Sequence, residues 1–374
     1  MRKIKMVDLH KQYLHIKTEI DKAIADVLNS TAFIQGPQVE EFATALGKYV
    51  GAQKTIPCAN GTDALQIAMM ALDLKAGDEV IVPVHTYVAT AEVIALLGLT
   101  PVFVDVDEDT FNIDTDQIKK VITKKTRAIV PVHLYGQCAD MEVILRLGDE
   151  HNLFIIEDAA QSLGAEYSFR GGSPGRKAGT MGIIGTTSFF PSKNLGCYGD
   201  GGAIFTNDTA LGEKLRMITN HGQSKKYHHD IIGMNSRLDT MQAAILNVKL
   251  NYLTQYARKR NEVAHYYDKA LSKDVVQTPV RAKNSTHVFH QYTVKISNRN
   301  RDTFQKYLSE NGIPSMIYYP VPLHLQKAYR RPGFAQGSFP VTERLSKTVI
   351  SLPIHTEMDP EDLDFICRTI NNFN

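Results

Sequence analysis

The sequence predicts an α/β protein in which a mostly parallel β-sheet lies between layers of helices. Two observations support this prediction. Between residues 79 and 158, short apolar runs alternate with segments of helical periodicity, which is the order of repeated strand–helix–strand units. The runs are apolar at nearly every position, so we expect both faces of each strand to be buried, as in a parallel sheet. Ligands of such sheets bind at the carboxyl ends of the strands.

The whole-chain properties exclude several classes of function. With 374 residues, the chain is long enough for two domains. Its formal net charge is +2 and it has no polybasic stretch interleaved with aromatic residues, so we expect no nucleic-acid partner. No run of about 18 apolar residues is present, which predicts a cytoplasmic protein without a membrane partner. The cysteines are widely spaced and the histidines lack ligand spacing, so we expect neither disulfides nor a metal.

The first half of the chain supplies the sheet and its helices. Helices are expected over residues 8–30 and 39–50, followed by a strand at 55–59 and a helix after Asn60-Gly-Thr-Asp. The strand–helix alternation then begins. Its strands are expected at 80–83, 102–106, 128–132 and 154–157, and its helices at 89–97, 115–122 and 141–151.

The second half changes in character beyond about residue 260. We therefore predict a large domain over residues 1–258 and a smaller α+β domain over residues 259–374. The loop-like segment that starts at Arg330 has no regular period and is expected to be a mobile surface segment. The remaining strands are expected at 186–190, 203–206 and 289–296, and the remaining helices at 211–219, 239–257, 261–271, 301–311 and 362–370. The segment 351–355 and the last of these helices complete the small domain.

Lys193 lies in a turn-rich segment between two expected strands. No other basic residue occurs between Lys177 and Lys214, and aromatic residues and glycines surround it in the sequence. An amine in this setting is easily desolvated, which lowers its pKa and makes it a nucleophile toward carbonyl groups, as in a Schiff-base lysine. A lysine on an ordinary loop is the alternative.

Polar groups at two other positions belong to the same edge of the expected sheet. Asp158 directly follows a buried strand, so its carboxylate should meet a cation or a strong donor, or cap the next turn. Strand, glycine, hydroxyl and helix follow one another around Gly61 and Thr62, which is how a chain directs backbone N–H groups at an anion. An ordinary N-cap by Thr62 explains that order equally well.

Several motifs occur in one register over nearly the whole chain, and together they resemble the sugar aminotransferases of the DegT/DnrJ/EryC1/StrS family. The resemblance implies the type I aminotransferase fold, pyridoxal 5'-phosphate (PLP) as the cofactor, and a keto group of a nucleotide-linked sugar as the acceptor. The motifs are Phe33-Ile-Gln-Gly-Pro, Asn60-Gly-Thr-Asp-Ala-Leu, Thr86-Tyr-Val-Ala-Thr, Glu157-Asp-Ala-Ala-Gln, Ser188-Phe-Phe-Pro-Ser-Lys, Gly199-Asp-Gly-Gly and Asn235-Ser-Arg-Leu-Asp.

The resemblance also implies roles for individual residues. Lys193 would hold the cofactor covalently and move a proton between substrate and cofactor carbons, while Asp158 would pair with the pyridine nitrogen. Tyr87 would stack on the ring and Gln161 would contact its hydroxyl. The glycines after Lys193 would let the lysine loop pass close to cofactor and substrate. The phosphate contacts implied are Gly61, Thr62, Ser188 and, from the neighbouring subunit of a homodimer with shared active sites, Asn235.

The substrate implied is less sharply defined. Tyr135-Gly-Gln-Cys-Ala-Asp and Tyr227-His-His resemble the WbpE/WlbC-type branch, which acts on UDP-2-acetamido-2-deoxy-3-oxo-glucuronate, commonly with glutamate as amino donor, in O-antigen-type polysaccharide biosynthesis. Arg237 would then bind the sugar carboxylate, because a guanidinium fork matches that group. That branch has His-Tyr-Pro where this chain has Tyr318 and Tyr319, with His324 a little further on. A neutral 3-keto or 4-keto deoxysugar nucleotide therefore stays open.

Three other functions fit the sequence less well than a sugar aminotransferase. Dehydratases of the same family replace the cofactor lysine by histidine, whereas this chain keeps Lys193. A non-catalytic PLP-binding regulatory protein would have no need of both Lys193 and Asp158. A nicotinamide-dependent oxidoreductase would require G-x-G-x-x-G after the first strand, which the sequence lacks. The sequence leaves the nucleotide, the C3 or C4 position, the stereochemistry and the amino donor open.

Overall fold

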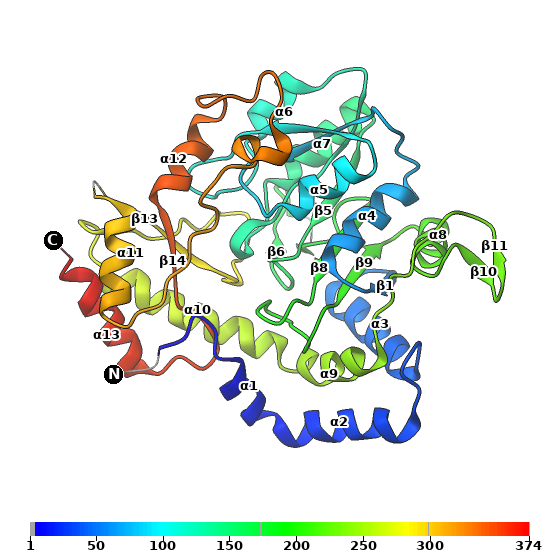
Figure 1. Ribbon diagram of the computed structural model, residues 1–374, viewed down its shortest axis with the longest axis horizontal. Helices are drawn as coiled ribbons and strands as arrows, with labels where there is room; N and C mark the ends of the chain where they lie inside the picture. Colours follow the sequence, from blue (N-terminus) through cyan, green and yellow to red (C-terminus); the bar gives the residue numbers. More distant parts are fainter. Residues whose placement is uncertain (1–3, 173, 298, 374) are drawn as a thin grey trace.

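The computed structural model describes residues 4–172, 174–297 and 299–373, and its centre is a seven-stranded sheet with helices on both faces (Figure 1). The strand order is β1-β9-β8-β5-β4-β2-β3. Strands β3, β2, β4, β5 and β8 pair in parallel, while β9 pairs antiparallel with both β8 and β1. The bounds are β1 Lys54–Cys58, β2 Glu79–Pro83, β3 Thr100–Val104, β4 Thr126–Ile129, β5 Phe154–Asp158, β8 Ile184–Ser188 and β9 Gly202–Thr206.

The expected mostly parallel sheet between helix layers is therefore confirmed, and strand β2 shows why its sequence is apolar throughout. Val80 and Val82 belong to the core cluster on one face of the sheet, and Ile81 belongs to the cluster on the other. Successive side chains of a strand point to opposite faces, so a strand covered on both sides needs apolar residues at every position.

Separate helices cover the two faces. Residues of α4 (Gly61–Ala71), α5 (Ala89–Leu96) and α8 (Thr209–Thr219) contribute to the first cluster. The opposite face carries α6 (Thr115–Val121) and α7 (Met141–His151). At the antiparallel end of the sheet, α3 (Pro37–Val50) and α9 (Thr240–Leu250) pack against β9 and the residues that follow β8.

Two expected helices are each divided in the structure. The segment 8–30 forms α1 (Leu9–His15) and α2 (Lys17–Ser30), with a break at Ile16, which is buried against Ile20 and Ile245. The expected helix 239–257 ends as α9 at Leu250, because the N–H groups of Asn251 and Tyr252 donate to carbonyls three residues back and tighten the last turn. The chain then continues as α10 (Leu253–Ala270).

The C-terminal residues form their own apolar cluster, which begins at Val263 on α10. Helices α11 (Arg301–Glu310) and α13 (Pro360–Asn371) pack there against a sheet of strand order β12-β13-β14. Because α10 continues across residues 258 and 259, the domain boundary at that point stays a prediction. The strands are β12 Val276–Gln277, β13 Tyr292–Ile296 and β14 Val349–Leu352.

The segment after Arg330 is a surface loop, as expected, and its mobility stays a prediction. Arg331 donates a hydrogen bond to the carbonyl oxygen of Pro101, and Phe334 packs on Phe103 with ring centroids 5.1 Å apart, so two contacts join the loop to the body of the protein. Helix α12 (Pro340–Thr348), which follows, was not expected. The remaining elements are the strand pairs β6 Glu166–Tyr167 with β7 Arg176–Lys177 and β10 Gln223–Lys225 with β11 His228–His229, and the short turns η1 Leu134–Gly136, η2 Leu323–Leu325 and η3 Lys327–Tyr329.

Within the part of the chain that the structure describes, none of the helices combines the length and the apolar character that a membrane crossing requires. The β10–β11 hairpin projects from the body of the protein at the right of Figure 1. Tyr227 at its tip is 80% exposed and Ile232 just beyond it is 86% exposed. Apolar side chains this exposed are typical of surfaces that meet a partner.

We predict that Arg260→Met lowers the free energy of unfolding by about 2–4 kcal/mol, because leaving a buried carbonyl without its donor costs about 1–3 kcal/mol. Arg260 is 3% exposed and donates to the carbonyl oxygens of Phe289, His290 and Ile354 at 3.0, 3.3 and 3.1 Å. Urea denaturation measures the change. The control is Arg258→Met on the same helix, whose side chain is 70% exposed. Equal midpoints for the two variants would contradict the prediction.

Candidate active site

A pocket of about 800 Å³ opens at the carboxyl ends of the parallel strands. The start of α4, the segments after β2, β5 and β8, and two stretches of the C-terminal part contribute its walls. The sequence-predicted residues that line it are Gly61, Thr62, Tyr87, Asp158, Gln161, Ser188, Lys193, Tyr318 and Tyr319.

The start of α4 and the end of β8 come unusually close together. Asn60 caps the helix, since its side chain accepts a hydrogen bond from the N–H of Asp63 at 2.8 Å, so the cap is Asn60 and not Thr62. A Cβ on Gly61 would lie 2.7 Å from the Cβ of Ser188. Glycine at this position therefore allows the hydroxyl of Ser188 and the free N–H groups of the first helical turn to face one point, which is an anion site.

The loop between β8 and β9 carries Lys193. Its base is closed by hydrogen bonds from the N–H of Phe189 to the carbonyl of Gly201 at 2.7 Å and from the N–H of Cys197 to the carbonyl of Phe189 at 2.8 Å. A Cβ on Gly202 would lie 2.5 Å from the carbonyl carbon of Asn60, so glycine at this position lets the lysine loop pass close to the start of α4.

Asp158 and Lys193 form the polar centre of the pocket. Asp158 is 6% exposed, and its carboxylate accepts hydrogen bonds from the hydroxyl of Thr90 at 2.8 Å and from the N–H of Ala160 at 3.1 Å. Desolvation lowers the pKa of Lys193 to about 8, although the charge of Asp158 opposes the shift. The carboxylate of Asp158 thus has the strong donors expected for it, whereas the reactivity of Lys193 stays a prediction. Thr90 was not singled out, although it closes the motif Thr86-Tyr-Val-Ala-Thr.

An aromatic wall faces this centre. Tyr87 is 57% exposed, and its ring centroid lies 6.2 Å from that of Tyr319. Gln161 accepts a hydrogen bond from the N–H of Tyr135 at 2.9 Å and donates from Nε2 to the hydroxyl of Tyr319 at 3.3 Å. Tyr135, which has a positive φ of 58°, also donates from its hydroxyl to the carbonyl of Tyr318. The buried Tyr135 therefore holds both Tyr318 in the pocket wall and the side-chain amide of Gln161.

His290 lines the pocket and was missed in the sequence. Its ring is 5% exposed, and Nδ1 has no hydrogen-bond partner within the described chain. Burial and the nearby charge of Lys193 hold the pKa of His290 well below its usual value, so the ring is a neutral acceptor. The available signal was the polar pair His290-Gln291 within the apolar run 289–296, which we assigned to a strand.

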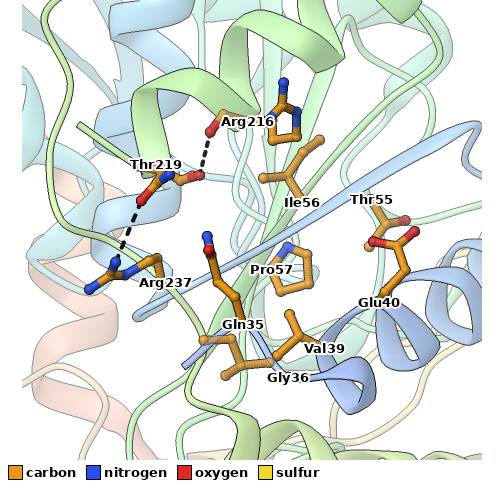
Figure 2. A pocket seen from close by; sticks show the side chains of 12 residues that line it. Gln35, Gly36, Val39, Glu40, Thr55, Ile56, Pro57, Arg216, Thr219 and Arg237 are labelled. Carbon is orange, nitrogen blue, oxygen red and sulfur yellow. Dashed lines mark hydrogen bonds between the residues drawn. The ribbon is translucent and has the colours of Figure 1, made fainter. Parts of the chain in front are cut away.

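Asn235 and Arg237 lie outside this pocket. Between them, Ser236 is fully buried, and its hydroxyl accepts a hydrogen bond from the N–H of Ala59 at 3.1 Å. Side chains alternate along an extended chain, so its two neighbours point to the opposite side. Arg237 lines a second pocket of about 240 Å³ together with Gln35, and it donates a long hydrogen bond to Asn220 at 3.5 Å (Figure 2).

His324 does not reach the substrate side, so its prediction as a substrate contact is wrong. Its ring is 0% exposed, and Nε2 lies 3.0 Å from Oε1 of Glu343 on α12. The short turn η2 directs the ring into the protein. Although burial opposes the shift, N–H donors from Gly337 and Phe339 and the contact with His324 lower the pKa of Glu343. The pair thus holds the segment before α12.

The chain is similar to known proteins over nearly its whole length. The DegT/DnrJ/EryC1/StrS aminotransferase family matches residues 14–371. The chain belongs to this family. A UDP-2-acetamido-2-deoxy-3-oxo-D-glucuronate aminotransferase of Pseudomonas aeruginosa is 45% identical, covering 99% of this chain and 100% of its own length. A protein of Geobacillus stearothermophilus described as a pleiotropic regulatory protein is 44% identical, covering 99% and 98%.

Solved structures agree with the sequence comparison. The crystal structure of DesV from S. venezuelae, in complex with a ketimine intermediate, has a TM-score of 0.94 and 39% identity, covering 99% of this chain and 98% of that one. The structure of NtdA from Bacillus subtilis with bound cofactor PMP has a TM-score of 0.85 and 32% identity, covering 94% and 80%. This family member is accordingly a PLP-dependent aminotransferase with the fold that the resemblance implied.

The pocket fits PLP by the chemistry of its donors. A phosphate needs N–H and hydroxyl donors, which the start of α4 and Ser188 supply. A protonated pyridine nitrogen needs a buried carboxylate, and Asp158 is one. A covalent link to the aldehyde carbon needs an amine that loses its proton readily, and the lowered pKa of Lys193 favours that loss. No group of three or more potential metal-ligating side chains occurs among the described residues.

We predict that Lys193 of the cofactor-free enzyme reacts with an amine-specific acylating reagent with a midpoint near pH 8. A lowered pKa keeps the amine protonated and unreactive below about pH 8 and neutral above it, whereas an ordinary lysine becomes neutral near pH 10.4. Peptide mass spectrometry at each pH measures the extent of labelling. Lys22, whose side chain is 75% exposed, is the internal reference. A common midpoint for the two lysines would contradict the prediction.

Proposed function

We propose that Lys193 is the cofactor-linking and proton-carrying residue of this aminotransferase and that Asp158 is the partner of the pyridine nitrogen. The observation that carries the proposal is one pocket in which an amine of lowered pKa and a buried carboxylate meet beside a helix N-terminus. Gly61, Thr62 and Ser188 then hold the phosphate.

The residues around the ring have supporting roles. PLP supplies an electron sink that stabilises negative charge on the substrate carbon. Asp158 keeps the ring nitrogen protonated, and Thr90 holds the carboxylate in place through its 2.8 Å hydrogen bond. Tyr87 would cover one face of the ring, and Gln161 would contact the ring hydroxyl. Lys193 would hold the cofactor covalently, and its Nζ would move a proton between the substrate and cofactor carbons.

The acceptor that we propose is UDP-2-acetamido-2-deoxy-3-oxo-glucuronate, with glutamate as amino donor. The relative from Pseudomonas aeruginosa, which covers the full length, supports this choice. The charges of the pocket indicate how a sugar acid could be bound. Asp63, Asp158 and Asp200 line it, and Lys193 is committed to the cofactor. A substrate with a carboxylate and a diphosphate therefore needs cations from outside this wall.

We further propose a homodimer in which a second copy supplies those groups. Asn235 is exposed and Arg237 is half-buried, and both point away from the pocket of their own chain. Exposed apolar side chains accompany them, because Phe33 and Ile34 are 47% and 51% exposed next to Gln35. A surface that joins apolar residues to a guanidinium is suited to an interface that also completes a site. Asn235 would reach the phosphate and Arg237 the sugar carboxylate.

A neutral 3-keto or 4-keto deoxysugar nucleotide is the alternative acceptor. It is favoured by Tyr318 and Tyr319, which make the wall opposite the cofactor residues aromatic rather than cationic. A regulatory role, as in the description of the Geobacillus relative, would leave the complete set of Lys193, Asp158 and Thr90 unexplained. We place the enzyme in the cytoplasm, where nucleotide sugars for O-antigen-type polysaccharides are made.

Borohydride should reduce the yellow holoenzyme and fix the cofactor on Lys193, whereas Lys193→Ala should not be trapped at any lysine. Peptide mapping after reduction identifies the modified residue, and the loss of the visible band follows the reaction. Asp158→Asn is the matched variant, which should still be trapped at Lys193 but lose most of its turnover because the ring nitrogen loses its partner. An unmodified Lys193 in the reduced wild-type enzyme would sink the assignment.

Arg237→Met should lower kcat/KM for the sugar acid by about 10–100-fold, since a charge-assisted hydrogen bond contributes about 1.5–3 kcal/mol. Its effect on the same nucleotide sugar with a neutral C6 group should be small. The measurement is single-turnover return of the enzyme loaded with the amine form of the cofactor, using both sugars. A wild-type enzyme that accepts only the neutral sugar would replace the uronate by the alternative.

A mixed dimer tests whether Arg237 contributes to the pocket of the partner subunit or to the pocket of its own chain. Lys193→Ala and Arg237→Met are each impaired for the sugar acid, and a dimer with one copy of each has one complete site only if Arg237 acts across the interface. Recovery of activity after mixing and reassembly supports the shared site. Activity that stays at the level of the separate variants argues that Arg237 serves its own chain or none.

A further inference from the structure

The loop that carries Lys193 rests on helix α9, and one contact between them involves a buried charged group. Lys249 in the last turn of α9 is 1% exposed, and its Nζ donates a hydrogen bond to the carbonyl oxygen of Gly196 in that loop. The ammonium also lies over the ring of Tyr198, 5.2 Å from its centroid. Figure 1 shows α9 running beneath the β8–β9 end of the sheet.

Stability alone does not explain a lysine at this position. Burying an ammonium is costly, and an apolar side chain of similar volume in such a place is often neutral or stabilising. The cost is visible in the amine itself, because desolvation lowers the pKa of Lys249 to about 8. The neighbours of Lys249 on α9, Leu246 and Leu250, are ordinary core residues. The contact with Gly196 is therefore the distinctive property of Lys249.

A second residue of α9 holds the same loop. The Oε1 of Gln242 accepts a hydrogen bond from the N–H of Tyr198 at 2.8 Å. A Cβ on Gly199 would lie 3.2 Å from Nε2 of Gln242, so the loop backbone is in direct contact with this amide. Gln242 and Lys249 are two helical turns apart on one face of α9. Together they fix the loop on both sides of Cys197.

The position of Gly196 is coupled to that of Lys193 by backbone contacts. A Cβ on Gly196 would lie 2.3 Å from the carbonyl oxygen of Pro191, so the two parts of the loop touch without room for a side chain. The N–H of Lys193 donates to the carbonyl of Phe190 at 2.8 Å, which ties Lys193 to the same turn. A displacement of Gly196 would therefore move the segment that carries the reactive amine.

We propose that Lys249 is a positioning residue of the active site, which holds the carbonyl of Gly196 and thereby keeps the Lys193 amine directed at the cofactor beside Asp158. Lys249 is not part of the pocket wall and acts only through the loop. The inference rests on the proposed role of Lys193. It adds a residue to the reaction that touches neither substrate nor cofactor.

The test compares Lys249→Met, which keeps the length of the side chain but removes the donor, with Lys249→Arg, which keeps a cation and donors. In the holoenzyme, Lys249→Met should bind cofactor, shift the pH midpoint of its visible absorption band, and lower kcat about tenfold with little change in KM for glutamate. Lys249→Arg should restore most of both properties. A Lys249→Met enzyme with the wild-type midpoint and kcat would overturn the proposal.

The control removes a comparable bond from the same helix. Asn247 donates from Nδ2 to the carbonyl oxygen of Gln38 at 3.0 Å, on α3 and away from the lysine loop. Asn247→Leu should lower the melting temperature but leave the absorption midpoint and kcat unchanged. Equal spectral changes in Asn247→Leu and Lys249→Met would show that α9 acts only through stability, which would also overturn the proposal.

A variant that fails to fold does not leave the question open. Gln242 is only half-buried, so Gln242→Leu removes the other anchor of the loop at smaller risk, and it should shift the absorption midpoint in the same direction. An unchanged midpoint in that variant argues against the proposal. Failure of borohydride to trap Lys193 in the wild-type enzyme would refute the proposed function itself, whereas normal trapping with wild-type properties in Lys249→Met refutes this inference alone.

Discussion

The buried carboxylate of Asp158 is the constraint on which the pocket depends. It stands at the buried end of β5, where an unpaired charge would be expensive. The hydroxyl of Thr90 at the start of α5 and the N–H of Ala160 donate hydrogen bonds to this carboxylate. These bonds also fix the positions of the two segments that carry the donors. Desolvation lowers the pKa of Lys193 to about 8, although the negative charge of Asp158 opposes this shift. The carboxylate and the amine are held at one strand edge by the sheet, not by contact with each other.

Features that depend on residues near one another in the sequence could be predicted, and features that depend on contacts between distant segments could not. The parallel strands and most helices could be predicted because local periodicity reports burial on two faces or one. Asp158 could be singled out because a carboxylate directly after an apolar run is conspicuous, and Lys193 because it is an isolated basic residue among aromatic residues and glycines. His324 could not be placed, since its orientation depends on Glu343 in an unexpected helix. His290 likewise reaches the pocket from a distant part of the chain, a position that leaves little trace in the local sequence.

The segment around Ser236 shows how one chain can serve two pockets. Ser236 holds Ala59 and so helps to place the start of α4 in its own pocket. The alternation of an extended backbone then turns Asn235 and Arg237 to the outer surface, beside Gln35 and two exposed apolar residues. Ser236, which helps to place the proposed phosphate site of its own subunit, is thus flanked by the residues proposed to act in the other subunit. This arrangement would couple dimer formation to completion of the site without a separate element.

Lys193 and Lys249 show why a shifted pKa does not by itself identify a reactive group. Desolvation lowers the pKa of both amines to about 8. Lys249 is buried, donates to the carbonyl of Gly196 and lies over the ring of Tyr198, where no substrate can reach it. Lys193 lines an open pocket and has a carboxylate within its field. Geometry therefore separates the amine proposed as the nucleophile from the amine proposed to support its loop. The cost of burying Lys249 is understandable if the loop must hold Lys193 in place.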